Sequence, residues 1–189
     1  LCYKKLSMSK KNSNVILKNN FKNYEELFFI YSAFKNKLKF LKKKNLLIAV
    51  SGGPDSLALT ALAKSFSYGN KCKIYYVLVD HNLRKNSSNE ARLVKKLLEK
   101  HQINLNILTN KKLIKNNIQS EARKIRYDLL TAFCKKKKIK TILTAHNLED
   151  QVETFFIRLS RGSGLHGLAS MKQVNKINND INLIRPLLD

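Results

Sequence analysis

The hydrophobic positions along the chain fall into short continuous runs separated by longer amphipathic stretches. The first run, Leu46–Val50, is typical of a strand that is buried on both faces of a parallel sheet. Similar runs predict three more strands, at residues 74–79, 103–108 and 141–144. A stretch with helical periodicity follows each strand. Four strand–helix repeats predict an α/β fold, with a parallel β-sheet flanked by helices on both faces in a Rossmann-like three-layer arrangement.

The segments outside this repeat are polar. Residues 1–45 are predicted to form a basic N-terminal extension, in which residues 24–40 fit one helix, and residues 46–189 the main domain. Ser87 followed by Glu90 has the pattern of a capping box, which predicts the start of a helix. The Asn-rich residues 174–182 predict a loop or hairpin.

Polar residues follow three of the four predicted strands. The loop 51–56 comes after the first strand, Asp80 and His81 come after the second, and His146 comes after the fourth. Ligands of open parallel sheets bind at the carboxyl ends of the strands. These residues are therefore expected to share one cleft.

The loop after the first strand has the composition of a phosphate-binding turn. Its two glycines let the backbone approach phosphate oxygens closely, and the amides at the following helix N-terminus point at the anion. A carboxylate at Asp55 would repel a triphosphate unless a cation intervened, which predicts either a Mg²⁺ ligand or a cap that shapes the loop. The alternative is an ordinary tight turn in which Asp55 caps the helix. The nucleotide-binding residues predicted here are Ser51, Gly52, Gly53, Pro54, Asp55, Ser56, Asp80 and His81.

A second group of polar residues begins at His146. Asp150 and Glu153 lie three residues apart and so share one face of the predicted helix, and Arg158 and Arg161 follow on the next turns. Paired acids beside a phosphate site could hold Mg²⁺, hold a substrate amine or act as a base. Acids that complement the helix dipole, with the arginines as their partners, are the alternative.

The composition favours a polyanionic partner without establishing one. The chain has 37 basic and 13 acidic residues, a net charge of +24, but 30 of the basic residues are Lys and Asn occurs 21 times. An A+T-rich genome would produce the same excess of Lys and Asn on any solvated surface. The three cysteines form no C-x-x-C pair, which favours a reducing cytoplasm, and no apolar run approaches the roughly 18 residues of a membrane span.

Five motifs carry a resemblance to a known family. Residues 51–56 look like the pyrophosphate loop of the N-type ATP pyrophosphatases. Together with residues 79–84, 146–154, 161–168 and 185–188, they resemble the tRNA(Ile)-lysidine synthase family. Two positions depart from the family pattern His-His-x-Asp-Asp-Gln, since Asn147 stands for the second His and Glu149 for the first Asp. Family members continue into further tRNA-binding domains, so residues 46–189 are expected to be the catalytic domain alone.

The resemblance implies an adenine-nucleotide α-hydrolase-like fold and a ligase that uses ATP and Mg²⁺. Its partners would be free L-lysine and an isoleucine tRNA with a CAU anticodon. The cytidine oxygen would attack the ATP α-phosphate and expel pyrophosphate, and the lysine amine would then displace AMP. A homodimer is compatible with the family. The implied catalytic residues are Asp55, His146, Asp150 and Glu153, with Asp55 as the Mg²⁺ ligand, and the residues that could touch tRNA are Arg84, Arg126, Arg158 and Arg161.

Two other readings stay open. A tRNA thiolase would use the same loop, but such enzymes commonly need cysteine pairs, and none of the three cysteines is placed as one. A nucleotide- or RNA-binding module without chemistry is the other reading. Acids at positions 55, 150 and 153 argue against this reading, because a purely basic RNA binder gains nothing from carboxylates in its cleft.

Overall fold

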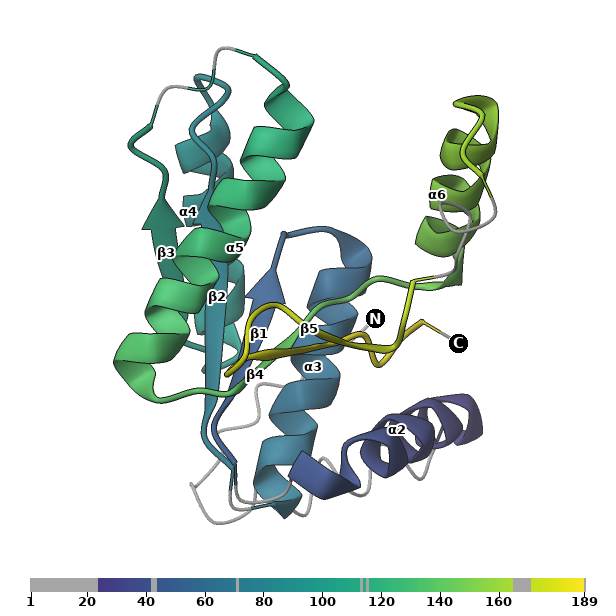
Figure 1. Ribbon diagram of the computed structural model, residues 1–189. Helices are drawn as coiled ribbons and strands as arrows, with labels where there is room; N and C mark the ends of the chain where they lie inside the picture. Colours follow the sequence, from purple (N-terminus) through teal and green to yellow (C-terminus); the bar gives the residue numbers. More distant parts are fainter. Residues whose placement is uncertain are drawn as a thin grey trace, which may run out of the picture.

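The computed structural model describes residues 24–41, 44–70, 72–112, 114, 116–164 and 171–188. A six-stranded sheet lies at its centre, with the order β3-β2-β1-β4-β6-β5 (Figure 1). All neighbouring strands are parallel except β5 and β6, which form an antiparallel hairpin. The strands are β1 (Leu46–Val50), β2 (Ile74–Asp80), β3 (Leu105–Thr109), β4 (Thr141–Leu143), β5 (Val174–Lys176) and β6 (Asn182–Ile184).

Helices cover both faces of the sheet, which confirms the predicted α/β class. Side chains of α2, α3 and α4 pack with those of the sheet into one core cluster, and side chains of α5 pack into the other. The last helix, α6, leaves the sheet after β4 and stands apart from these layers (Figure 1). The helices are α2 (Glu25–Lys37), α3 (Pro54–Gly69), α4 (Ser87–Lys100), α5 (Ile118–Lys137) and α6 (Leu148–Ser160), with a 3-10 turn η1 (Lys39–Leu41).

The central strand β1 divides its side chains between the two cores. Leu46, Ile48 and Val50 belong to the cluster with α3, and Leu47 belongs to the cluster with α5. Successive side chains of a strand point to opposite faces, so a continuous apolar run supplies both cores at once. This arrangement brings the end of β1, and the loop after it, to the middle of the sheet.

Helix α2 is part of the main core rather than a separate element. Its Phe34 is 2% exposed and meets Phe66 of α3 edge-to-face, with 6.2 Å between the ring centroids. Leu38 and Leu41, just beyond the helix, are also buried. The predicted helix at 24–40 is therefore confirmed as α2 and η1, whereas residues 1–23 of the predicted extension lie outside the described residues.

Two local predictions need correction. Helix α4 does begin at Ser87, but the predicted capping box is absent: Asn86 is the N-cap, Ser87 is already the first helical residue, and no side chain caps the helix. The Glu90 carboxylate pairs with Arg84. The third strand begins at Leu105 rather than at residue 103, since the chain is still turning at Gln102, where φ is +58°. The Asn-rich tail forms a hairpin, and β6 extends the sheet beyond β4.

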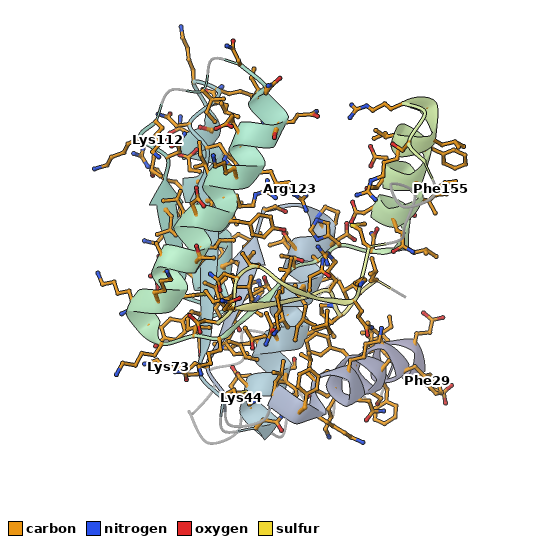
Figure 2. The ribbon with its side chains drawn as sticks, viewed as in Figure 1. Phe29, Lys44, Lys73, Lys112, Arg123 and Phe155 are labelled. Carbon is orange, nitrogen blue, oxygen red and sulfur yellow. The ribbon has the colours of Figure 1, made fainter. Side chains whose placement is uncertain are left out.

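Several apolar side chains of α2 and α6 remain exposed. Phe29 and Phe155 point away from the body of the molecule (Figure 2), with 70% and 41% of their surface exposed. No residue of α6 is buried. In the described part of the chain, no helix has both the length and the apolar character needed to cross a bilayer.

Buried charge is rare. Among the described residues, Asp80 (4% exposed) and Arg185 (3%) are the only buried side chains of the charged types, and every described Lys is at least partly exposed. A buried charge is costly unless it is paired or hydrogen-bonded. Asp80 is the last residue of β2 and Arg185 directly follows β6, so both lie at the carboxyl end of the sheet.

Candidate active site

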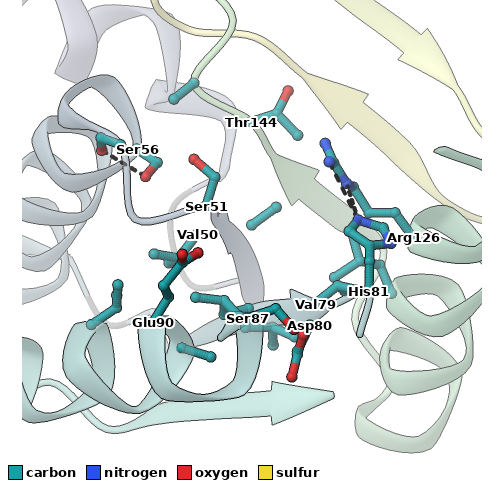
Figure 3. A pocket seen from close by; sticks show the side chains of 18 of the residues that line it. Val50, Ser51, Ser56, Val79, Asp80, His81, Ser87, Glu90, Arg126 and Thr144 are labelled. Atoms are coloured by element: carbon teal, nitrogen blue, oxygen red, sulfur yellow. Dashed lines mark hydrogen bonds between the residues drawn. The ribbon is translucent and has the colours of Figure 1, made fainter. Parts of the chain in front are cut away.

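A cleft of about 410 Å³ opens at the carboxyl ends of β1, β2 and β4 (Figure 3). This volume lies within the usual range for small-ligand sites. The cleft brings together three of the predicted groups: the loop after β1, the end of β2 and the start of the segment that leads into α6. Its lining includes the predicted residues Ser51, Gly53, Asp55, Ser56, Asp80, His81, Arg84, Arg126, His146 and Asp150.

The loop after β1 is braced from within. Gly52 has a φ of +92°, and its N–H donates to Ser56 Oγ at 3.0 Å. The Ser56 hydroxyl in turn donates to the Gly53 carbonyl oxygen at 2.9 Å. A Cβ at Gly52 would come within 2.8 Å of Val94 Cγ2 on α4, so α4 packs against the bare backbone of the loop. The Ser56 hydroxyl thus shapes the loop, and its predicted contact with nucleotide stays a prediction.

The N-terminus of α3 faces the cleft without a side-chain cap. Gly53 occupies the N-cap position and Pro54 the first turn, so the first amides of the helix are left for a ligand. Such amides, with the positive end of the helix dipole, form an anion site. This geometry fits the phosphates of ATP, because the backbone lies open where the phosphates would approach.

Asp55 offers the carboxylate that Mg²⁺ would need. Its side chain is exposed in the first turn of α3 and lines the cleft. Within the described ranges, no cluster of three His, Cys, Asp or Glu side chains could hold a metal on its own. One carboxylate is nevertheless sufficient for Mg²⁺ that is bound mainly by substrate phosphates and water.

The carboxylate of Asp80 ties β2 to α4. Its Oδ1 accepts from the Asn82 N–H at 2.9 Å, and its Oδ2 accepts from the Ser88 hydroxyl at 2.6 Å. Burial acts to raise the pKa of Asp80, but the hydrogen bonds from Ser88 and Asn82 outweigh it, so the pKa lies below its ordinary value. Each oxygen of the carboxylate already accepts a hydrogen bond from the protein. A contact of Asp80 with nucleotide remains a prediction.

We expect Ser88→Ala to destabilise the fold in a pH-dependent way. A lowered carboxyl pKa stabilises the folded state above the unfolded pKa of about 4 and loses that contribution as pH falls through the folded pKa. The variant should therefore lose about 1.5–3 kcal/mol at pH 7, and the loss should shrink below about pH 4. Urea unfolding at several pH values would measure this, with the exposed Ser120→Ala as control. A loss that is constant with pH would uncouple Ser88 from the charge of Asp80.

His81 and Arg126 come together on one side of the cleft. The guanidinium Nε and Nη2 of Arg126 both lie 3.4 Å from His81 Nε2 (Figure 3). Burial, and then the Arg126 charge, lower the pKa of His81, while Asp80 opposes them. Arg84 is highly exposed and pairs with Glu90 at 3.7 Å on the rim. The structure thus places two predicted RNA-contacting arginines beside the predicted nucleotide residues.

The second predicted group divides in the structure. Asp150 lines the cleft and also forms a capping box with Asn147: its Oδ2 accepts from the Asn147 N–H at 2.9 Å. Glu153 is exposed on α6 and, like Arg158 and Arg161, does not belong to the cleft lining among the described residues. The motif at 161–168 is described only as far as residue 164, so its remainder lies outside the described residues.

His146 lines the cleft just after β4. Its ring is half-buried, and its Nδ1 is 2.9 Å from Thr144 Oγ1. Burial first, and then the Arg185 charge, lower the pKa of His146, against the opposing effect of Asp150. His146 is therefore an uncharged imidazole near neutral pH.

Sequence reasoning missed several residues of the cleft. Thr144 directly follows β4, and Ser87 and Glu90 lie in the first turn of α4. Tyr127 of α5 completes the wall beside Arg126. Their positions could have identified them, because polar residues at the carboxyl end of a strand, or in the first turn of the next helix, tend to line the ligand site of such a sheet.

The chain is similar to known proteins in both sequence and fold. Residues 27–189 match the family model of the PP-loop domain. The chain is 42% identical over 151 residues to the tRNA(Ile)-lysidine synthase of Orientia tsutsugamushi (strain Boryong), covering 79% of this chain and 34% of the relative. It is 41% identical over 169 residues to the enzyme of the same name from Wolbachia pipientis wMel, covering 87% and 38%. The chain thus spans about a third of the length of these curated relatives.

A solved structure shares the fold. The U34-tRNA thiolase NcsA from Methanococcus maripaludis, with its 4Fe-4S cluster, matches with a TM-score of 0.69 and 18% sequence identity. The match covers 85% of this chain and 59% of that chain. At this identity the likeness extends to the fold alone.

Proposed function

This chain belongs to the PP-loop domain family, and from that membership and the cleft we propose that it is the ATP-using domain of a tRNA(Ile)-lysidine synthase. Its substrates would be ATP, free lysine and the wobble cytidine of an isoleucine tRNA with a CAU anticodon. The single observation that carries the proposal is the uncapped N-terminus of α3, which lines the same cleft as His146 and Asp150. An anion site that shares a cleft with a carboxylate suits a reaction that expels pyrophosphate and then uses an amine.

The loop residues would act on the phosphates. The backbone amides at the start of α3 would bind the β- and γ-phosphates and stabilise the charge that develops as pyrophosphate leaves. Mg²⁺, when bound by Asp55 and the phosphates, would neutralise part of that charge. The internal brace through Ser56 keeps the loop in this shape before the nucleotide arrives, so little reorganisation is needed at the moment of reaction.

Asp150 would act in the second half of the reaction. The cytidine oxygen attacks the α-phosphate, pyrophosphate departs, and the lysine amine then attacks carbon 2 and displaces AMP. A protonated amine is not a nucleophile, so a carboxylate must hold it and take its proton. Asp150 lines the cleft and retains one oxygen, Oδ1, beyond the bond that its Oδ2 makes to Asn147. Glu153, exposed on α6, is a weaker candidate for this role.

The thiolase alternative gains no support from the described cysteines. Cys134 of α5 is buried in the core, and burial raises its pKa to about 12. Cys72 packs against the other core, and burial raises its pKa as well. Neither residue lines the cleft among the described residues, and a thiol held protonated is a poor nucleophile or ligand.

Asp55→Ala is expected to abolish Mg²⁺- and ATP-dependent transfer of labelled lysine to an isoleucine tRNA transcript with a CAU anticodon. Transfer by the unmodified chain, with none to a methionine tRNA of the same anticodon, would support the proposal. Loss of the Asp55 carboxylate should lower the rate by about 100-fold or more, because it removes charge neutralisation at the phosphates. ATP binding is measured in parallel by calorimetry with Mg²⁺. An unmodified chain that neither binds ATP nor transfers lysine would overturn the proposal.

A further inference from the structure

Thr144 is buried at the end of β4, where its hydroxyl has one partner. Its Oγ1 lies 2.9 Å from His146 Nδ1, and no other hydrogen bond of that hydroxyl is found among the described residues. A hydroxyl always carries a proton to donate. If Nδ1 also carried a proton, two donors would face each other at 2.9 Å and the hydroxyl would lose its one acceptor among the described residues. The arrangement that satisfies both groups has Thr144 donating and Nδ1 accepting.

The remaining proton of the ring then lies on Nε2, which is the nitrogen open to the cleft. His146 lines the cleft, and no nitrogen of its ring is buried without a partner. The charged groups that act on the ring are Arg185 after β6, Arg123 and Arg126 of α5, and Asp150 of α6. Three cations against one anion disfavour a second proton on the imidazole.

Arg185 is the unusual member of this group. Its side chain is 3% exposed, its Nη1 donates to the Lys172 carbonyl oxygen at 2.7 Å, and its Nε is buried without a partner. No carboxylate pairs with it among the described residues. Tyr127 also acts on the guanidinium, but a buried cation without a carboxylate partner makes its surroundings, which include His146, electropositive. This charge favours phosphate nearby and at the same time disfavours a charged imidazole.

From this geometry we propose that Thr144 is a positioning residue that fixes His146 in the tautomer protonated on Nε2. The uncharged imidazole then presents a hydrogen-bond donor to a phosphate oxygen of the nucleotide, and no proton leaves the ring during the reaction. A neutral imidazole can serve as such a donor when its surroundings suppress the imidazolium. The inference rests on the proposed function only in taking phosphate as the ligand of the cleft.

Nuclear magnetic resonance can read the tautomer directly. Long-range ¹H–¹⁵N correlation spectra of the ¹⁵N-labelled chain at pH 7, without nucleotide, should show His146 with an unprotonated Nδ1 and a protonated Nε2. His146→Gln assigns its signals among the four histidines. Thr144→Ser, which keeps the hydroxyl, should leave this pattern unchanged, and the isosteric Thr144→Val should give a mixture of tautomers. A protonated Nδ1 in the unmodified chain, or the same pattern in Thr144→Val, would overturn the inference.

Kinetics provide the second arm. Thr144→Val should lower the rate of lysine transfer at saturating ATP by at least about tenfold, since a misaligned donor loses part of its transition-state stabilisation. The KM for ATP should change little, and Thr144→Ser should restore the rate. A Thr144→Val variant that folds, by its amide spectrum, and transfers lysine at the full rate would contradict the positioning role. If the unmodified chain neither binds ATP nor transfers lysine, the proposed function fails, while the tautomer spectra still decide the inference.

Discussion

Gly52→Ala should weaken ATP binding by at least about tenfold. The backbone at Gly52 has a φ of +92°, which an alanine adopts only with strain. The added Cβ would also meet Val94 Cγ2 at 2.8 Å, closer than real Cβ atoms approach. The loop would have to move, and with it the N–H that holds Ser56. Calorimetric titration with ATP and Mg²⁺ measures the loss.

Matched variants separate the two causes. Gly69→Ala adds the same methyl group at the end of α3, where no atom lies within 4 Å, and should leave ATP binding unchanged. Combining Gly52→Ala with Val94→Ala removes the collision but retains the strained φ. Partial recovery in this double variant is expected. Full binding by Gly52→Ala alone would show that the loop does not need its present shape to hold the nucleotide.

Asp150→Ala should reduce lysine transfer by about 10²–10⁴-fold, the range for loss of a group that moves a proton in the transition state. The change removes the carboxylate from the cleft, but it also removes half of the capping box of α6. Asn147→Ala isolates the capping effect, because it deletes the other half of the box and leaves the carboxylate in place. That control should lose about 1 kcal/mol of stability and retain most of the transfer rate.

The dependence on lysine concentration distinguishes two roles for Asp150. If the carboxylate mainly holds the lysine amine, Asp150→Ala should raise the KM for lysine; if it mainly takes the proton, the variant should lower kcat. Asp150→Asn keeps the size of the side chain and its ability to accept a bond from Asn147, so it tests the charge alone. Equal losses in Asn147→Ala and Asp150→Ala would assign Asp150 to the helix cap and remove it from the chemistry.

The sheet and the phosphate loop were predictable because their signals are local. A buried apolar run such as Leu46–Val50 has few alternatives to a central strand, and Gly52, Gly53 and Pro54 suit a turn into a helix. The position of Glu153 was not predictable. Helical periodicity establishes that Asp150 and Glu153 share a face, but it does not say how far α6 departs from the sheet. The capping of α4 was mispredicted, because Asn86 rather than Ser87 is the N-cap and Ser87 already lies inside the helix.

Thr144 illustrates a different limit. In sequence it is the last residue of an apolar strand, and threonine is common in strands for its β-branched shape alone. Its role depends on the hydroxyl having a single acceptor, the ring of His146, which only the packed structure reveals. Arg185 was likewise visible as a motif residue, but its burial without a carboxylate partner was not.

The net charge of +24 includes two kinds of charge with different electrostatic effects: many exposed lysines and, among the described residues, very few buried charged side chains. Exposed lysines form a diffuse field that salt screens within about 10 Å at 0.1 M. Asp80 and Arg185 are buried, so the local potential that they set at the cleft is screened far less. Salt titrations should therefore separate the two, with RNA affinity falling steeply as ionic strength rises and the protonation state of His146 nearly constant. The lysine content of the surface is free to follow the base composition of a genome while the chemistry of the cleft stays the same.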